Sequence, residues 1–194
     1  MTEEHRLKTP SMALVQHYTF AFDSELSYSA PDQALEALFK IYPLNSNLEE
    51  VLIKVSALNS LYSTNIFAIV DAAKHIQSTG VDGAISAGFP TAIELVASME
   101  IGGKQRRNYS FATKYCSRHN PNSYPVYDSY VDSLLWAHRR QDEFSDFKRD
   151  DLRNYEKFKT IVQTFTRHYD LEGCSFKELD KFLWLYGRSE FAAT

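Results

Sequence analysis

One stretch of the chain collects basic side chains and ends at a single carboxylate. Residues 101–127 contain no Asp or Glu, and Asp128 follows them directly. The stretch carries a formal charge of +5, whereas the whole chain carries −4, so the remainder sums to −9. Such local charge is either tolerated as self-repulsion or neutralised by a polyanion. The basic side chains of this pattern could bind phosphates, and the single acid could then take part in a reaction. The basic residues are Lys104, Arg106, Arg107, Lys114 and Arg118.

Asp128 has two compatible interpretations. It follows the Pro125 turn and precedes an apolar helical pattern over residues 130–138, and an Asp in that place is typically a helix N-cap. In the functional interpretation, the helix start holds the same carboxylate rigid and ionised, as an acid acting on a developing cation must be. Asp132, one helical turn later, could be a second acid, but a surface role is expected for it.

The turn that opens the basic stretch also has two interpretations. As plain structure, it ends one helix and continues as a solvated basic loop. As a functional element, its backbone N–H groups bind phosphate oxygens ahead of the next helix, and Lys and Arg side chains add positive charge. The residues concerned are Gly102, Gly103, Lys104, Gln105, Arg106, Arg107 and Asn108.

The elements that must position these residues are predicted to be helices. Apolar side chains recur at helical spacing nearly throughout, for example in the run Ile66, Phe67, Val70, Ala73 and Ile76. No strand alternation of useful length is present. Three Ser/Thr-x-x-Glu pairs predict helix starts, namely Ser46 with Glu49, Thr91 with Glu94, and Ser175 with Glu178. The sequence therefore predicts an all-α fold of about eight to ten helices.

Several helix boundaries follow from individual residues. A helix over 31–42 is expected to carry its proline in the first turn, and glycines are expected to end two other helices at Gly80 and Gly187. Residues 11–22 fit a helix and an extended segment equally well. The densely charged residues 141–154 are expected to form a solvated connection or a short helical turn.

The domain organisation predicted is one all-α domain over residues 1–194. No linker rich in Gly, Ser or Pro separates two parts of the chain. An all-α chain of this length can still form two lobes, with a hairpin-containing lobe over about 40–136 and the termini forming the other.

The basic turn, the helix after it and the acid turn together resemble the helix–hairpin–helix DNA glycosylases that carry a Gly/Pro-Asp motif. Residues 101–105 resemble the hairpin of that family, and residues 108–119 its second helix. Residues 125–131 are similar to the turn that bears the catalytic acid, with one extra residue before Asp128. Residues 60–66 are similar to a Ser-x-Gln-x-Thr-Asp segment that lies beside the opened base pair.

This resemblance covers about residues 48–136 and implies a compact helical domain with a helix–hairpin–helix element. It implies an enzyme that flips a modified or damaged base out of DNA and excises it by hydrolysing the N-glycosidic bond. Asp128 would be the catalytic residue, residues 102–108 would bind DNA, and Tyr62 and Asn65 would form the base wedge or pocket. Repair and defence against modified viral DNA are both compatible roles.

The chain departs from the family pattern at several positions. The hairpin lacks its proline, Gln105 replaces the second glycine, and Tyr62 stands where Gln is usual. Family members with lyase activity carry a Lys on the second helix, and that place falls on Arg107 or Asn108 here. Neither can form a Schiff base, so the resemblance implies a glycosylase without lyase activity.

Composition bounds the remaining choices. Two cysteines and six scattered histidines provide no metal-ligand spacing, so we expect neither a metal nor a cofactor. No run approaches the roughly 20 apolar residues that span a bilayer, and no signal segment is evident, so we expect a soluble, cytoplasmic and monomeric protein.

The partner expected is DNA, but two other functions stay open. The chain could be a non-catalytic DNA-binding module on the same scaffold, or an all-α interaction protein with no nucleic-acid role. The aromatic residues Tyr18, Tyr28 and Tyr130 could line a base pocket, although core or surface packing is the preferred explanation for each of them.

Overall fold

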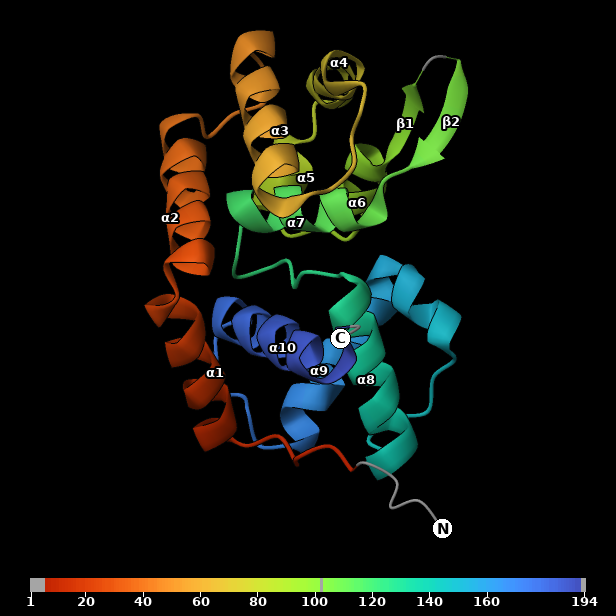
Figure 1. Ribbon diagram of the computed structural model, residues 1–194. Coiled ribbons are helices and arrows are strands. Elements are labelled where there is room, and N and C mark those ends of the chain that lie inside the picture. The colour runs from red at the N-terminus through yellow and green to blue at the C-terminus, as the bar shows by residue number, and fades with distance from the viewer. Residues whose placement is uncertain (1–5, 102, 193–194) are drawn as a thin grey trace. The chain divides into compact units, whose positions relative to one another are not determined.

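The computed structural model describes residues 6–101 and 103–192. Within them the chain forms ten α-helices, one 3-10 helix and one two-stranded sheet (Figure 1), which confirms the predicted all-α class. The chain divides into two units. We call Glu25–Tyr127 the hairpin unit, and Met1–Ser24 together with Asp128–Thr194 the terminal unit. The hairpin unit thus begins and ends earlier in the sequence than the lobe outlined above.

The hairpin unit is a group of helices with a β-ribbon between the last two. Helix α3 packs against α2 and α4, α6 packs against α7, and α4 also packs along β1. The apolar faces of these helices meet in one core that includes Leu35, Val51, Leu58, Ile76, Ile93 and Phe111. The elements are α2 (Leu26–Ile41), α3 (Leu48–Tyr62), α4 (Ile69–Thr79), α5 (Asp82–Ser86), α6 (Thr91–Ala97), β1 (Ser98–Ile101), β2 (Lys104–Arg107) and α7 (Tyr109–His119).

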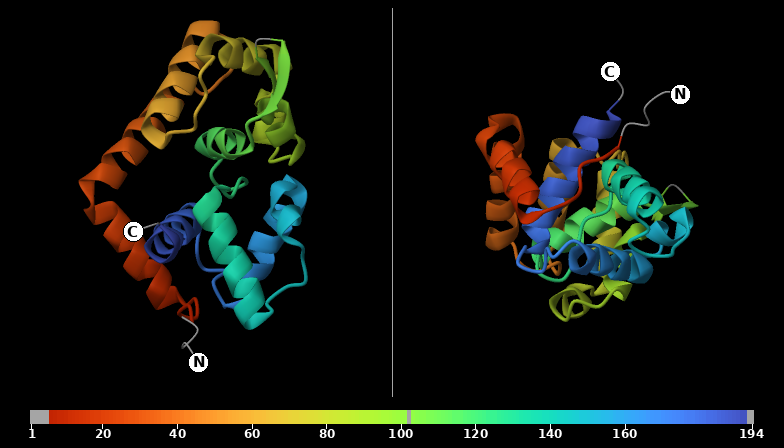
Figure 2. Two further views of the ribbon diagram at one scale, coloured as in Figure 1. Left: turned by 45° about the vertical axis from the view of Figure 1, so that its right-hand side comes forward. Right: turned by 90° about the horizontal axis from the view of Figure 1, so that it is seen from below.

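The two strands were not predicted from the sequence. They pair antiparallel, with Ser98 opposite Arg107 and Ile101 opposite Lys104. The ribbon projects beyond the helices of its own unit (Figures 1 and 2), and every β2 side chain is exposed. A ribbon with little apolar side-chain alternation leaves no periodic signal, which explains the missed strands.

The terminal unit joins the first described helix to the last four helical elements. Helix α10 packs against both α1 and α8, and the 3-10 helix η1 packs against α9. Its core is rich in aromatic side chains, including Phe158, Phe165 and Phe182. The elements are α1 (Met12–Ser24), α8 (Ser129–Asp142), η1 (Arg149–Arg153), α9 (Tyr155–His168) and α10 (Phe176–Phe191).

Some predicted helix boundaries are correct. Ser175 and Glu178 form a reciprocal capping box at the start of α10, and Gly80 ends α4 with φ at +62°. The other two pairs locate helix starts but do not cap them. Helix α6 begins at Thr91, which makes no capping bond. Helix α3 begins at Leu48, and its cap is Asn47, not Ser46, because the Asn47 side chain accepts the Glu50 N–H at 3.0 Å.

Two further predicted helix boundaries are wrong. Pro31 lies inside α2, since the helix already begins at Leu26 with Glu25 as its cap. Gly187 does not end α10, which continues to Phe191. A Cβ atom at Gly187 would lie 2.7 Å from the carbonyl oxygen of Tyr130, so this glycine permits the close approach of α10 to α8. Among the described residues, no helix combines the length and apolarity of a membrane span.

Candidate nucleic-acid interface

Asp128 is the N-cap of α8, as its sequence context predicts. Its Oδ1 accepts hydrogen bonds from the backbone N–H groups of Tyr130 at 2.9 Å and Val131 at 3.0 Å. The residue is 8% exposed, and the carboxylate lies at the positive end of the helix dipole. The side chain is therefore fixed in position, and its negative charge is stabilised by α8.

The segment before Asp128 is fastened to α7 within the hairpin unit. The Thr113 hydroxyl accepts the Tyr127 N–H at 3.1 Å and approaches the Tyr127 carbonyl oxygen at 3.3 Å. The Tyr127 ring packs on Tyr109 with centroids 4.7 Å apart. Upstream, the Tyr124 hydroxyl donates toward the carbonyl oxygens of Ala84 and Phe89, each at 3.0 Å. These contacts fix the backbone up to the last residue before the acid.

The positive charge of the acid-free stretch is partly neutralised by acids from other elements. Arg107 pairs with Glu94 of α6, and its guanidinium stacks 4.4 Å from the centroid of the Tyr109 ring. The hydrogen bond that Arg107 donates to Glu94 raises the pKa of this arginine. Arg118 pairs with the buried Asp32 of α2. Neither acid is near its partner in sequence, so a window of charge could not reveal the pairs.

The ribbon keeps its other polar side chains exposed. Lys104, Gln105 and Arg106 are all exposed, and neither cation has an ion-pair partner among the described residues. Gly103 occupies the turn with φ at +73°, a left-handed conformation that favours glycine. Gly102 lies outside the described residues. Asn108 joins the ribbon to α7, and its backbone N–H donates to the Ala97 carbonyl oxygen at 2.9 Å.

Tyr62 and Asn65 lie at the end of α3 and in the loop that follows. The Tyr62 hydroxyl lies 3.3 Å from Asp32 Oδ1, and its ring lies 5.2 Å from the Arg118 guanidinium. Tyr62 is thus engaged with two charged side chains of its own unit. Asn65 is exposed and has a left-handed backbone, with φ at +60°.

The same loop exposes an aromatic residue that the helical pattern placed in the core. Phe67 is 92% exposed, and it precedes α4, which begins at Ile69. The Asn59 side chain fixes the loop before it, accepting from the Thr64 hydroxyl at 2.9 Å and the Ile66 N–H at 2.8 Å. Helical spacing misassigned Phe67 because α4 begins after it.

A buried polar network in the hairpin unit was not predicted. Lys54 of α3 is fully buried and donates to the carbonyl oxygens of Tyr42 at 3.0 Å and Leu44 at 2.7 Å, and to Asn45 Oδ1 at 2.8 Å. Burial lowers the pKa of Lys54 to about 8. Burial and the nearby Lys54 ammonium lower the pKa of His119 to about 3. The network holds the α2–α3 connection, and its burial gives it a structural role.

The terminal unit contains a second buried group of polar side chains. His138 Nδ1 lies 3.0 Å from Asp142 Oδ2, and the Tyr169 hydroxyl donates to the same oxygen at 2.7 Å. Burial lowers the pKa of His138, which has no exposed surface. The hydrogen-bonded arrangement of these three side chains resembles a catalytic relay. However, His138 is fully buried, so a substrate could not reach the imidazole without opening the core.

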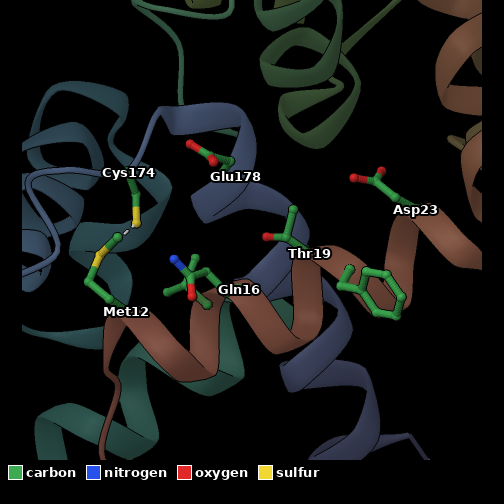
Figure 3. Close-up of a pocket in the computed structure, with 8 residues that line it drawn as sticks. Met12, Gln16, Thr19, Asp23, Cys174 and Glu178 are labelled. Atoms are coloured by element: carbon green, nitrogen blue, oxygen red, sulfur yellow. Dashed lines mark hydrogen bonds between the residues drawn. The ribbon is translucent and has the colours of Figure 1, made fainter.

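A shallow pocket of about 240 Å³ lies elsewhere in the terminal unit (Figure 3). It lies along α1, between that helix and the start of α10. Two of its lining residues are in contact through their sulfur atoms, with Cys174 Sγ 3.4 Å from Met12 Sδ. Asp128 is not among its lining residues. No group of three His, Cys, Asp or Glu side chains within 6–101 and 103–192 is arranged to hold a metal ion.

Fold and site together define an all-α protein with a basic β-ribbon and a helix-capping aspartate. The chain belongs to the HI_0787_N family, described as an N-terminal domain, whose model matches residues 14–123. A Haemophilus influenzae protein described as an "Uncharacterized protein" is 45% identical over 145 residues, which cover 74% of this chain and 69% of that protein. No solved structure matches the chain.

Proposed function

We propose that this protein is a DNA glycosylase without lyase activity that excises a modified or damaged base. The observation that carries the proposal is the fixed carboxylate of Asp128, which directly follows an acid-free basic segment with two exposed cations on a projecting ribbon. The resemblance of residues 48–136 to the helix–hairpin–helix glycosylases supports the same assignment. Repair and defence against modified viral DNA are both proposed contexts for this chemistry.

In the proposed reaction, the bond between the base nitrogen and the sugar C1′ breaks, and the electron pair leaves with the base. Water adds to C1′, and its proton balances the departing base. Asp128 stabilises the oxocarbenium-like sugar and orients or deprotonates the water. Lys104 and Arg106 bind flanking phosphates, which supplies affinity without sequence information. By the same resemblance, the place of the lyase lysine falls on Arg107 or Asn108, neither of which can form a Schiff base.

The second candidate function is a DNA-binding module without catalysis. It is favoured by the 8% exposure of Asp128 and by its two bonds to the start of α8, because helix capping alone explains an aspartate there. The third, an interaction protein with no nucleic-acid role, would leave the ribbon cations without a polyanion.

The test is base release from duplexes that carry different modified bases. After incubation with the protein, alkali cleaves each abasic site and the broken strands are counted. We expect strand breaks with at least one modified base, and a loss of about 10²-fold or more in Asp128→Asn. Asparagine also caps helices well, so this variant removes the charge while keeping the start of α8.

Asn154→Ala is the matched structural control. Asn154 caps α9 in the same unit, where its side chain accepts the Lys157 N–H at 3.1 Å, so its loss weakens a helix start without removing an acid. Base release that survives in Asn154→Ala and vanishes in Asp128→Asn supports the catalytic assignment. DNA binding that survives Asp128→Asn, with no base released from any substrate, would establish the non-catalytic module instead.

A further inference from the structure

We propose that the protein binds the phosphate backbone of double-stranded DNA through one face of the β-ribbon, and that Lys104 and Arg106 alone supply the ribbon's phosphate contacts. This inference rests on the proposed DNA function and deepens it. It narrows the expected DNA-binding residues from the seven of the basic turn, 102–108, to two side chains on one surface. The third ribbon cation, Arg107, instead attaches the ribbon to the rest of its unit.

Strand alternation separates the ribbon side chains into two faces. Successive residues of a strand point to opposite faces, and residues directly opposite in an antiparallel pair share a face. Lys104 and Arg106 therefore share a face, and Met99 lies opposite Arg106 on it. The other face carries Gln105 opposite Glu100, and Arg107 opposite Ser98. One face thus holds two exposed cations on β2 beside the buried Met99 of β1, and the other holds an acid and an already paired arginine.

The contacts of Arg107 show why it is assigned a structural role. Its guanidinium donates to both carboxylate oxygens of Glu94 and stacks on the Tyr109 ring. Two of its nitrogens already donate to Glu94, so a DNA phosphate that approached the guanidinium would lie beside this carboxylate and be repelled by it. Arg107 therefore attaches β2 to α6 and to the first residue of α7.

The two remaining cations of the acid-free stretch, Lys114 and Arg118, lie on α7 and do not belong to the ribbon surface. Arg118 lies at the last turn of α7 and pairs with Asp32, while the Lys114 ammonium donates to the Ser110 hydroxyl at 2.8 Å. Lys104 and Arg106 differ in being exposed and in having no acid partner among the described residues. Of the formal +5 in the sequence window, +2 is presented on one ribbon face.

The shape of the element favours duplex DNA as the polyanion. A two-stranded ribbon fits the major groove, which is about 12 Å wide, and cations two residues apart on one strand lie roughly 6.5–7 Å apart. That separation matches neighbouring phosphates of one strand to within the reach of Lys and Arg side chains. All four β2 side chains are exposed, so β2 is accessible for this contact, whereas Met99 of β1 on the same face is buried.

The test is the salt dependence of DNA affinity, measured on the full chain with an unmodified duplex between 50 and 200 mM salt. Each phosphate contact contributes about 0.9 to the slope of log affinity against log salt. We expect Lys104→Ala and Arg106→Ala each to lower the slope by about 0.9, so that the loss of affinity over this range becomes about 3.5-fold smaller. Arg107→Ala is expected to leave the slope unchanged while lowering the melting temperature.

Arg140→Ala is the charge-matched control, because Arg140 is exposed on the last turn of α8 in the other unit. Slopes that fall in the two ribbon-face variants and stay unchanged in Arg107→Ala and Arg140→Ala support the inference. DNA binding with wild-type slopes in Lys104→Ala and Arg106→Ala overturns it, together with the phosphate contacts given to these two residues in the proposed reaction, but leaves base release by Asp128 untouched.

Two further outcomes separate the inference from the function on which it rests. Equal slope changes in Arg106→Ala and Arg107→Ala would overturn the division into faces while leaving the DNA function intact. A wild-type chain that binds no duplex even at 50 mM salt would overturn both proposals. Tighter binding to a single strand of the same sequence, with its smaller expected slope of about 0.7 for each contact, would overturn the choice of duplex DNA.

Discussion

At the scale of single residues, side chains of similar chemistry that lie close together in the sequence have different surroundings in the structure. Arg106 and Arg107 are neighbours in sequence, but they lie on opposite faces of β2, and one is paired with Glu94. Tyr62 and Phe67 are close in sequence, but the first contacts charged side chains of its own unit and the second is almost fully exposed. Composition alone cannot separate such pairs, because exposure and partners depend on elements elsewhere in the chain.

Gly187 gives a prediction at this scale. Gly187→Ala should destabilise the protein by about 1–3 kcal/mol, because a Cβ atom would lie 2.7 Å from the Tyr130 carbonyl oxygen and force α10 away from α8. Denaturant unfolding followed by circular dichroism measures the change. Gly83→Ala is the control, since no atom lies within 4 Å of its added Cβ and alanine favours the helix. Equal stability of the Gly187→Ala variant and the wild type would show that the two helices can separate without cost.

At the scale of elements, sequence patterns located the helices better than their ends or contacts. Apolar spacing found α4 and α8, and the Ser175 capping box and the Asp128 cap were correct, because these signals are local. The ribbon, the interior position of Pro31 and the glycine contact at Gly187 were missed. The Gly187 contact depends on α8, which no local window contains. The ribbon lacks a periodic signal, and α2 begins at Leu26, ahead of the proline that was predicted to lie in its first turn.

The candidate site was predicted to a similar extent. Its residue types and the capping role of Asp128 follow from the sequence, because a helix cap has a local signature. The pairing of Arg107 with Glu94 and of Arg118 with Asp32 does not, because each acid lies on a helix outside the acid-free stretch. Consequently the sequence overestimates the charge that the basic stretch presents to a ligand.

The buried network between α3 and α7 gives a prediction about pH. The pKa of His119 is lowered to about 3 in the folded protein, so below about pH 6.5 the unfolded chain takes up a proton that the folded protein does not. Stability should therefore fall as pH decreases from 6.5 toward 3, by at most about 1.4 kcal/mol per pH unit from this group. Urea unfolding at pH 6.5 and pH 5 measures the difference for the wild type and His119→Gln.

The variant should lose less stability between these two pH values than the wild type does. His17→Gln is the control, since this histidine is exposed on α1 and belongs to the other unit. It should keep the wild-type pH dependence. A His119→Gln variant with the full wild-type dependence would mean that other groups, such as buried carboxylates, account for the acid sensitivity.

At the scale of the whole molecule, the order of elements makes the two ends of the chain depend on each other. The terminal unit needs α1 from the N-terminal part and α8 to α10 from the C-terminal part, while the hairpin unit is one continuous segment between them. Both tryptophans, Trp136 of α8 and Trp184 of α10, belong to the terminal unit. Their fluorescence therefore reports on that unit alone.

Removal of residues 1–24 should accordingly perturb one unit and spare the other. The deletion takes away Phe22, which packs edge-on against Trp184 with ring centroids 5.9 Å apart, and it uncovers the face of α10 that α1 covers. Tryptophan emission should shift to the red and lose its cooperative unfolding transition. Amide hydrogen exchange of α3 and α7 should stay protected, because no residue of the hairpin unit is removed. Loss of protection in both units together would show that they fold as one cooperative body.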